Sequence, residues 1–186
     1  MTSITTARIL IISDMGFEQS ELEFPRDQLR AKGAEVHVAT PTGEAVTGWE
    51  GSNWGREAEA DLKIEDADPN QYDALVIPGG QINPDLLRVN AAAVALVKAF
   101  NDQGKVIAAV CHAPWLLIEA GIVAGREVTG YPSIRTDLEN AGGQVMDAPV
   151  VVDQGIVTSR NPDDLKHFVG KIVEEIEEGR HGRAAA

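Results

Sequence analysis

Short apolar runs recur along this chain, and they restrict its fold more than any other feature. The runs are Ala7–Ser13 (ARILIIS), Asp73–Ile77 (DALVI) and Val106–Val110 (VIAAV), and apolar residues do not alternate with polar ones within them. Such strands are typical of parallel sheets that are covered on both faces, and segments of helical character separate the runs. We therefore predict an α/β fold, a three-layer sandwich in which helices cover both faces of a mostly parallel sheet.

The remaining segments fit this plan. Residues 41–69 contain four glycines that break up short segments able to form one hairpin, in which Trp49 and Trp54 either pack on the domain or contact a second subunit. We predict a single domain over residues 1–178 and a flexible C-terminal tail over residues 179–186. The expected helices are 18–32, 91–103, 114–120, 133–141 and the segment that begins at 165, and the further strands are 35–40, 126–129, 150–152 and 155–159.

Charge and cysteine content exclude several classes of protein. The chain has 16 basic and 29 acidic residues in 186, a formal net charge of −13, which repels phosphate groups. We therefore expect no nucleic-acid partner and no anionic membrane partner. A single cysteine excludes an intrachain disulfide framework, and the opening MTSITTARILII shows neither a signal peptide nor a membrane span. The expected location is cytoplasmic.

The only cysteine lies where a strand is expected to meet a helix. Cys111 follows the run Val106–Val110, and Pro114 suits the first turn of a helix. A thiol just before a helix N-terminus is exposed to unpaired N–H groups and to the positive end of the helix dipole, which both favour the thiolate. The alternative, which is more common for a lone cysteine in an apolar run, is a small inert core residue.

Three features are expected at the same edge of the sheet, beyond the carboxyl ends of its strands. The first strand leads to Glu18, the third to Gly79 and Gly80, and the fourth to Cys111 and His112. Paired glycines after a strand either receive an oxyanion on their N–H groups or simply form a tight turn. The convergence of all three favours a site over three unrelated features.

Ordered motifs along the chain resemble the ThiJ/PfpI superfamily, also described as the parkinsonism-associated protein deglycase superfamily. The motifs are GFEQSE (16–21), VIPGG (76–80), AVCHAP (109–114), TGYPSIRTDLENAG (129–142) and VVVDQGIVTSRNPDDL (150–165). The resemblance implies a flavodoxin-like fold of the class I glutamine amidotransferase kind and is strongest to the PfpI branch. Members of that branch are described as intracellular cysteine peptidases and as stress proteins acting on methylglyoxal or on proteins glycated by it.

The resemblance also implies roles for the converging residues. Cys111 corresponds to the nucleophile, His112 to the catalytic histidine, and Glu18 to a protonated acid beside the sulfur. Gly80 of the Gly79-Gly80 turn, together with the N–H of His112, would supply the oxyanion donors. Without the resemblance, a helix-capping residue is the more common interpretation of Glu18.

Two positions depart from the family pattern. Ala91 stands where peptidase members carry an acid that orients the histidine across a subunit contact, which counts against efficient proteolysis. Ala113 stands where the family usually has glycine, and a positive φ there would add strain.

The leading hypothesis is therefore a cysteine-dependent stress-response hydrolase or lyase of the deglycase or glyoxalase kind. Its substrates would be small reactive carbonyls or glycated proteins. A cysteine peptidase, a redox sensor or holdase without enzymatic activity, and an inactive homologue remain as alternatives. We expect no cofactor, and no metal because the histidines lack ligand spacing. By resemblance, the partner is a second copy of the chain, in a homodimer or a larger homo-oligomer.

Overall fold

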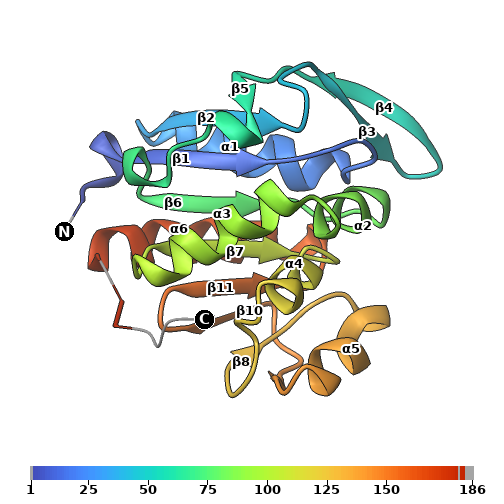
Figure 1. Ribbon diagram of the computed structural model, residues 1–186, viewed down its shortest axis with the longest axis vertical. Coiled ribbons are helices and arrows are strands. Elements are labelled where there is room, and N and C mark those ends of the chain that lie inside the picture. The colour runs from blue at the N-terminus through green and yellow to red at the C-terminus, as the bar shows by residue number, and fades with distance from the viewer. Residues whose placement is uncertain (1, 180, 183–186) are drawn as a thin grey trace.

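A parallel sheet forms the centre of the computed structural model, which describes residues 2–179, 181 and 182 (Figure 1). Within these residues the main sheet has seven strands in the order β10-β11-β7-β6-β1-β2-β5. All neighbouring strands are parallel except β10, which pairs antiparallel with β11. The strands are β1 (Arg8–Ile12), β2 (Glu35–Thr40), β5 (Leu62–Lys63), β6 (Ala74–Ile77), β7 (Val106–Val110), β10 (Val150–Asp153) and β11 (Ile156–Ser159).

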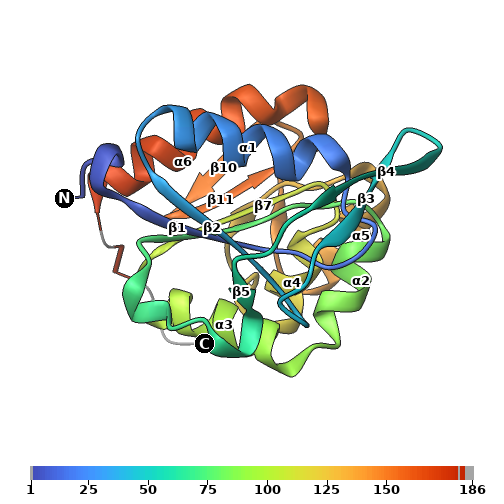
Figure 2. The same cartoon turned by 90° about the horizontal axis from the view of Figure 1, so that it is seen from above.

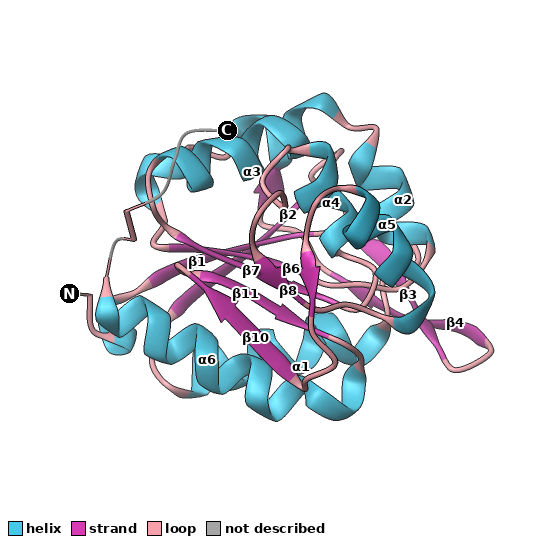
Figure 3. Ribbon diagram, turned by 90° about the horizontal axis from the view of Figure 1, so that it is seen from below, coloured by secondary structure: helices cyan, strands magenta, loops and turns pink. Residues whose placement is uncertain are grey.

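Helices cover both faces of the sheet, as Figures 2 and 3 show from opposite sides. One layer consists of α1 (Gln19–Ala31) and α6 (Leu165–Glu178). The other contains α2 (Ile82–Arg88), α3 (Ala91–Asp102) and α4 (Pro114–Glu119), and α5 (Arg135–Asn140) contacts α4. The predicted three-layer α/β architecture is confirmed.

Two apolar cores explain why the central strands carry no polar alternation. Successive residues of β1 point to opposite faces, so that Leu10 enters the core beneath α3 while Ile11 enters the core beneath α1 and α6. Phe100 of α3 is fully buried in the first core, and Phe168 of α6 is fully buried in the second. A strand with both faces buried must be apolar at every position.

The glycine-rich segment forms the predicted hairpin, from β3 (Val46–Glu50) and β4 (Asn53–Ala58). Trp49 pairs with Trp54 across the two strands, with ring centroids 5.3 Å apart. Trp54 is 53% exposed, whereas Trp49 faces the cavity described below. The hairpin is joined to the start of α1, because the N–H of Trp49 donates to the carbonyl of Phe17 at 2.6 Å.

Three short elements are absent from the sequence-based prediction. They are α2, β5 and β9 (Gln144–Val145), which pairs with β8 (Glu127–Val128). Strands β5 and β9 have two residues each and are too short to show a period. Helix α2 spans seven residues and includes Pro84 near its start, so no amphipathic repeat identifies it.

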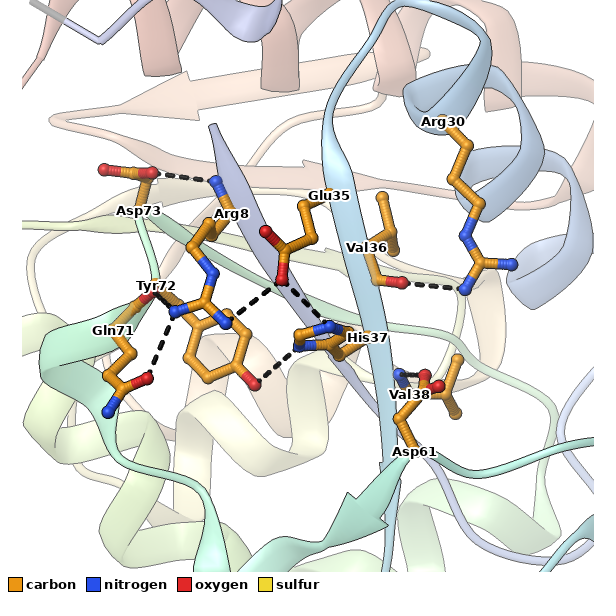
Figure 4. A network of polar contacts seen from close by, with 10 residues as sticks. All are labelled: Arg8, Arg30, Glu35, Val36, His37, Val38, Asp61, Gln71, Tyr72 and Asp73. Carbon is orange, nitrogen blue, oxygen red and sulfur yellow. Dashed lines mark hydrogen bonds and ion pairs between the residues drawn. The ribbon is translucent and has the colours of Figure 1, made fainter. Parts of the chain in front are cut away.

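His37 lies in β2, beside Leu10 of β1, and belongs to the group of polar residues drawn in Figure 4. Its Nδ1 is 2.9 Å from the hydroxyl of Tyr72, and its Nε2 is 3.1 Å from Oε1 of Glu35. The same oxygen of Glu35 accepts a hydrogen bond from Arg8 at 3.1 Å. This histidine therefore belongs to a polar network that links β1, β2 and the start of β6.

The predicted tail over 179–186 falls partly outside the described residues. Among those described, His181 donates its backbone N–H to the carbonyl of Gly104 at 2.9 Å, and its Nε2 is 3.2 Å from Glu175. No helix within the described part of the chain is both long and apolar enough to cross a membrane.

Candidate active site

Cys111 occupies a strained turn between β7 and α4. Its φ is +63°, a left-handed conformation that costs a residue with a Cβ ~1–2 kcal/mol. The turn is fixed on both sides, because the N–H of Cys111 donates to Ser159 O at 3.0 Å and its carbonyl accepts from Tyr131 N at 2.8 Å. Ala113 has an ordinary helical φ of −57°, so the backbone strain that a positive φ would cause at this alanine does not occur. The strained residue is the cysteine itself.

The Gly79-Gly80 turn passes directly beside the cysteine. A Cβ on Gly79 would lie 2.6 Å from Cβ of Cys111, so only glycine permits this approach. Gly80 has a φ of +80°, and its N–H donates toward the sulfur. The buried Asn83 of α2 fixes the turn by donating from Nδ2 to Pro78 O at 2.8 Å. The sulfur is therefore contacted by the two N–H donors predicted for an oxyanion, those of Gly80 and His112.

Glu21 is the carboxyl group beside the sulfur. It is fully buried, its Oε2 accepts from Gly79 N at 2.9 Å, and its side chain hydrogen-bonds with the thiol of Cys111. Burial, reinforced by the nearby charge of Glu18, raises the pKa of Glu21 to about 8. At neutral pH the carboxyl is therefore mostly protonated and able to donate.

The expectation that Glu18 lies beside the sulfur is wrong. Glu18 is the N-cap residue of α1, and its Oε2 accepts from the N–H of Glu21 at 2.9 Å and from Ser20 Oγ at 2.5 Å. These bonds satisfy a free N–H of the first helical turn, which is the common role of a polar N-cap. Glu18 lines the cavity, but the carboxyl that hydrogen-bonds with the thiol of Cys111 is that of Glu21.

The resting form of Cys111 also differs from the expectation. Burial raises the pKa of the thiol above its ordinary value, while the N–H groups of Gly80 and His112 lower it. With the side chain 5% exposed, burial outweighs the two donors. Since the helix that follows is only six residues long, its dipole adds little. A protonated thiol needs a base before it can attack.

His112 is placed to be that base. Its Nδ1 lies 3.1 Å from Sγ of Cys111, and its Nε2 lies 3.0 Å from Oγ of Ser133. The ring stacks on Tyr131 with centroids 4.7 Å apart and meets the edge of Trp115 at 5.3 Å. Burial lowers the pKa of His112, so the imidazole is neutral at neutral pH.

The partner of His112 is therefore a hydroxyl, not a carboxylate. Ala91, at the position of the acid in peptidase members, is the exposed first residue of α3. Among the described residues, no carboxylate hydrogen-bonds to the imidazole. The contact of Ser133 with His112 could not be predicted from the sequence, because no local spacing relates a serine to a histidine 21 positions earlier.

A cavity of about 460 Å³ opens above the sulfur. Its walls include Trp49, Ile82, Tyr131 and Pro162, and Cys111 and Glu21 line it too. Among the described residues that line it, the acidic ones are Glu18 and Glu21, and none carries a cationic side chain that could bind a substrate carboxylate or phosphate. Across the described residues, no cluster of three or more histidine, cysteine, aspartate or glutamate side chains is placed to hold a metal ion.

A second hollow of about 450 Å³ has Tyr72, Asp73 and Lys105 among its lining residues. Asp73 and Lys105 precede β6 and β7, so this hollow lies at the opposite, amino-terminal edge of the sheet. Neither cysteine nor histidine lines it, and its volume alone is no sign of chemistry.

Comparison with known proteins finds one matching family, related sequences and similar solved structures. The sequence model of the DJ-1/PfpI family matches residues 7–175. The chain is 38% identical over 166 residues to the deglycase PfpI of Pyrococcus furiosus, covering 89% of this chain and 97% of that protein. It is 40% identical over 162 residues to YraA of Bacillus subtilis, provisionally named a cysteine protease, covering 87% and 93%. The crystal structure of Drosophila melanogaster DJ-1beta superposes with a TM-score of 0.83 at 29% identity, covering 93% and 95%.

Proposed function

Because the chain belongs to the DJ-1/PfpI family, we propose that it is a cysteine-dependent enzyme that converts reactive carbonyls, or their adducts on proteins, into hydroxy acids. The name of its Pyrococcus furiosus relative, a deglycase, supports this class of reaction. The observation that carries the proposal is the position of Cys111, whose sulfur has a neutral base on one side and a protonated acid on the other, beneath an apolar cavity.

The first step is addition of the thiol to an aldehyde such as methylglyoxal. Nδ1 of His112 takes the proton as Sγ of Cys111 bonds to the aldehyde carbon, and the C=O electron pair moves onto the oxygen. The N–H groups of Gly80 and His112, which contact the sulfur before the reaction, are the nearest backbone donors to the oxygen and would hydrogen-bond to its negative charge. The imidazolium of His112 then returns the proton to this oxygen, which gives a hemithioacetal on Cys111 and a neutral imidazole.

The second step moves hydrogen within the adduct and releases it. A proton leaves the former aldehyde carbon and another is delivered to the neighbouring carbon, which gives a thioester of a hydroxy acid. The neutral imidazole of His112 is suited to accept the proton that leaves, and Glu21, which is protonated at neutral pH because its pKa is about 8, is suited to deliver the other; both line the same cavity as Cys111. Water then cleaves the thioester, so the net reaction is methylglyoxal plus water to lactate, with no external oxidant.

The proposal is tested by measuring methylglyoxal loss and lactate formation by the wild type beside Cys111→Ala. The wild type is expected to form one lactate for each methylglyoxal consumed, and Cys111→Ala to reduce the rate to that of the buffer. Equal rates for the two proteins would contradict the proposal. A buffer blank at each pH corrects for the uncatalysed reaction.

A cysteine peptidase is the second candidate, favoured by the 40% identity to YraA. It would use the same Cys111 but needs a histidine that remains an imidazolium until the leaving amine is protonated. The partner of His112 is the neutral hydroxyl of Ser133, which stabilises an imidazolium less than a carboxylate does. Turnover of casein or a fluorogenic peptide that is abolished by Cys111→Ser would establish the peptidase instead.

A further inference from the structure

Ser133 is held beside the catalytic pair by a different element from those that carry Cys111 and Glu21. It lies in the short helical turn Pro132–Ile134, immediately before α5. The residue is exposed, but its hydroxyl points at the buried ring of His112, with Oγ 3.0 Å from Nε2. Within the described part of the chain, this is the hydrogen bond that the hydroxyl makes.

The imidazole is confined on its remaining sides. Tyr131 stacks on it with an interplanar angle of 24°, and Trp115 meets it at 65°. These contacts fix the plane of the ring, but an aromatic face does not determine which nitrogen carries the proton. Nδ1 faces the sulfur of Cys111, and the hydrogen bond to Ser133 is the contact that Nε2 makes on the opposite side of the ring.

We propose that Ser133 is the positioning residue of His112, accepting a hydrogen bond from Nε2–H and so directing the lone pair of Nδ1 at the thiol of Cys111. This inference rests on the proposed function and adds a residue to it. When Nδ1 takes the thiol proton, the ring becomes an imidazolium, and its Nε2–H continues to donate to Oγ. Ser133 gains and loses no proton.

Because Ser133 is a neutral partner of His112, it affects the protonation state of the imidazole differently from a carboxylate. A carboxylate at this position would raise the pKa of the imidazole and favour a thiolate–imidazolium pair at rest. A hydroxyl orients the ring without stabilising its charge, which matches a resting state of neutral thiol and neutral imidazole. Among the described residues, the other titratable groups that contact the ring or line a hollow with it are the thiol of Cys111, the phenol of Tyr131, the carboxyls of Glu18 and Glu21 in the main cavity and, in a neighbouring groove, Asp85 of α2.

The test compares Ser133→Ala with Ser133→Thr, which keeps the hydroxyl, and with Ser52→Ala, an exposed serine in the hairpin turn. Ser133→Ala is expected to lower kcat for methylglyoxal about ten-fold, the effect of one hydrogen bond, with KM within about two-fold. Ser133→Thr and Ser52→Ala are expected to stay within about two-fold of the wild type. Wild-type kcat in Ser133→Ala would overturn the proposal.

A second measurement, of the tautomer and titration of His112, does not depend on methylglyoxal turnover. Ring nitrogen NMR, assigned with His112→Ala, is expected to show one tautomer in the wild type and averaged signals in Ser133→Ala. Ser133→Asp is expected to raise the titration midpoint of His112 by about one pH unit or more, and to shift the alkylation of Cys111 by iodoacetamide to lower pH. Unchanged spectra in both variants would overturn the positioning role. A wild type inert toward methylglyoxal would contradict the proposed function alone, because the spectra still decide the role of Ser133.

Discussion

Oε2 of Glu21 accepts a hydrogen bond from the N–H of Gly79 at 2.9 Å, and this bond ties the first helix to the loop that faces the cysteine. Both groups are buried, and a Cβ on Gly79 would clash with that oxygen and with Cys111. The acid, the oxyanion loop and the nucleophile are thus in contact although they come from three separate segments. Each residue fixes the other two, so changes at any of them are expected to affect the same chemistry.

The pH dependence of methylglyoxal turnover follows from Glu21 and His112. Burial lowers the pKa of His112, so the base remains neutral down to below its ordinary pKa of 6.5. The pKa of Glu21 is about 8, so its protonated form is lost above that pH. We expect kcat/KM to fall on the alkaline side with a midpoint near pH 8, as part of a bell-shaped profile. A profile that rises steadily to pH 10 would contradict a protonated acid.

The stability of the fold is expected to depend on the same carboxyl. A folded-state pKa of about 8, above the ordinary 4.5, means that the native state binds the proton more tightly than the unfolded chain does. The stabilisation is fully present below pH 4.5 and is lost as the pH rises through about 8.

Glu21→Gln mimics the protonated acid and removes this titration. Between pH 5 and pH 8, the wild type should lose at least ~1 kcal/mol of unfolding free energy relative to the variant, as measured by urea denaturation. A constant difference between the two proteins at all pH values would show that Glu21 does not titrate with a raised pKa.

Gly80 and Gly121 provide a matched pair for testing the oxyanion turn. Both have positive φ, +80° and +73°, so alanine adds comparable backbone strain at each. A Cβ at Gly80 would lie 2.5 Å from Gly16 O and 2.7 Å from Glu18 N, whereas at Gly121 nothing lies within 4 Å. Gly80→Ala should therefore cost at least ~2 kcal/mol more stability than Gly121→Ala. If urea denaturation gave the same loss of unfolding free energy for both variants, the close packing around the Gly79-Gly80 turn would be contradicted.

Oxidation of Cys111 tests the redox-sensor hypothesis. Peroxide reacts with the thiolate, and burial raises the pKa of this thiol. Intact-mass measurement after brief, mild peroxide treatment at pH 7 is expected to show little added oxygen at Cys111. Rapid and complete gain of two oxygens would instead favour the sensor.

The fold was predictable because its signals are local. Each buried strand is a short apolar run, and α6 repeats apolar residues at the spacing of a helix from Leu165 to Ile176. The turn at Cys111 was also predictable, because a strand pattern ends there and Pro114 starts a helix. Helix α2 was not, because its stability comes from contacts such as that of Asn83 with the glycine turn, which no periodicity reveals.

The site was predicted only in part, because its chemistry depends on burial and on contacts distant in sequence. Glu18 and Glu21 are both near the start of α1, and choosing between them requires knowing that Glu18 is the N-cap. One signal was present: Glu21 shares the inward face of α1 with Leu22, Pro25 and Leu29. A glutamate on the apolar face of a helix is either paired or protonated.

The most direct test of this account compares Glu21→Gln with Glu18→Gln in methylglyoxal turnover. Glutamine at position 21 can still accept from Gly79 N–H but cannot move a proton, so kcat should fall at least ~100-fold. Glutamine at position 18 weakens a helix cap, at a cost of about 1 kcal/mol in stability, and kcat should stay within about five-fold of the wild type. A large loss in Glu18→Gln with near-normal kcat in Glu21→Gln would contradict the assignment of Glu21 as the acid partner of Cys111.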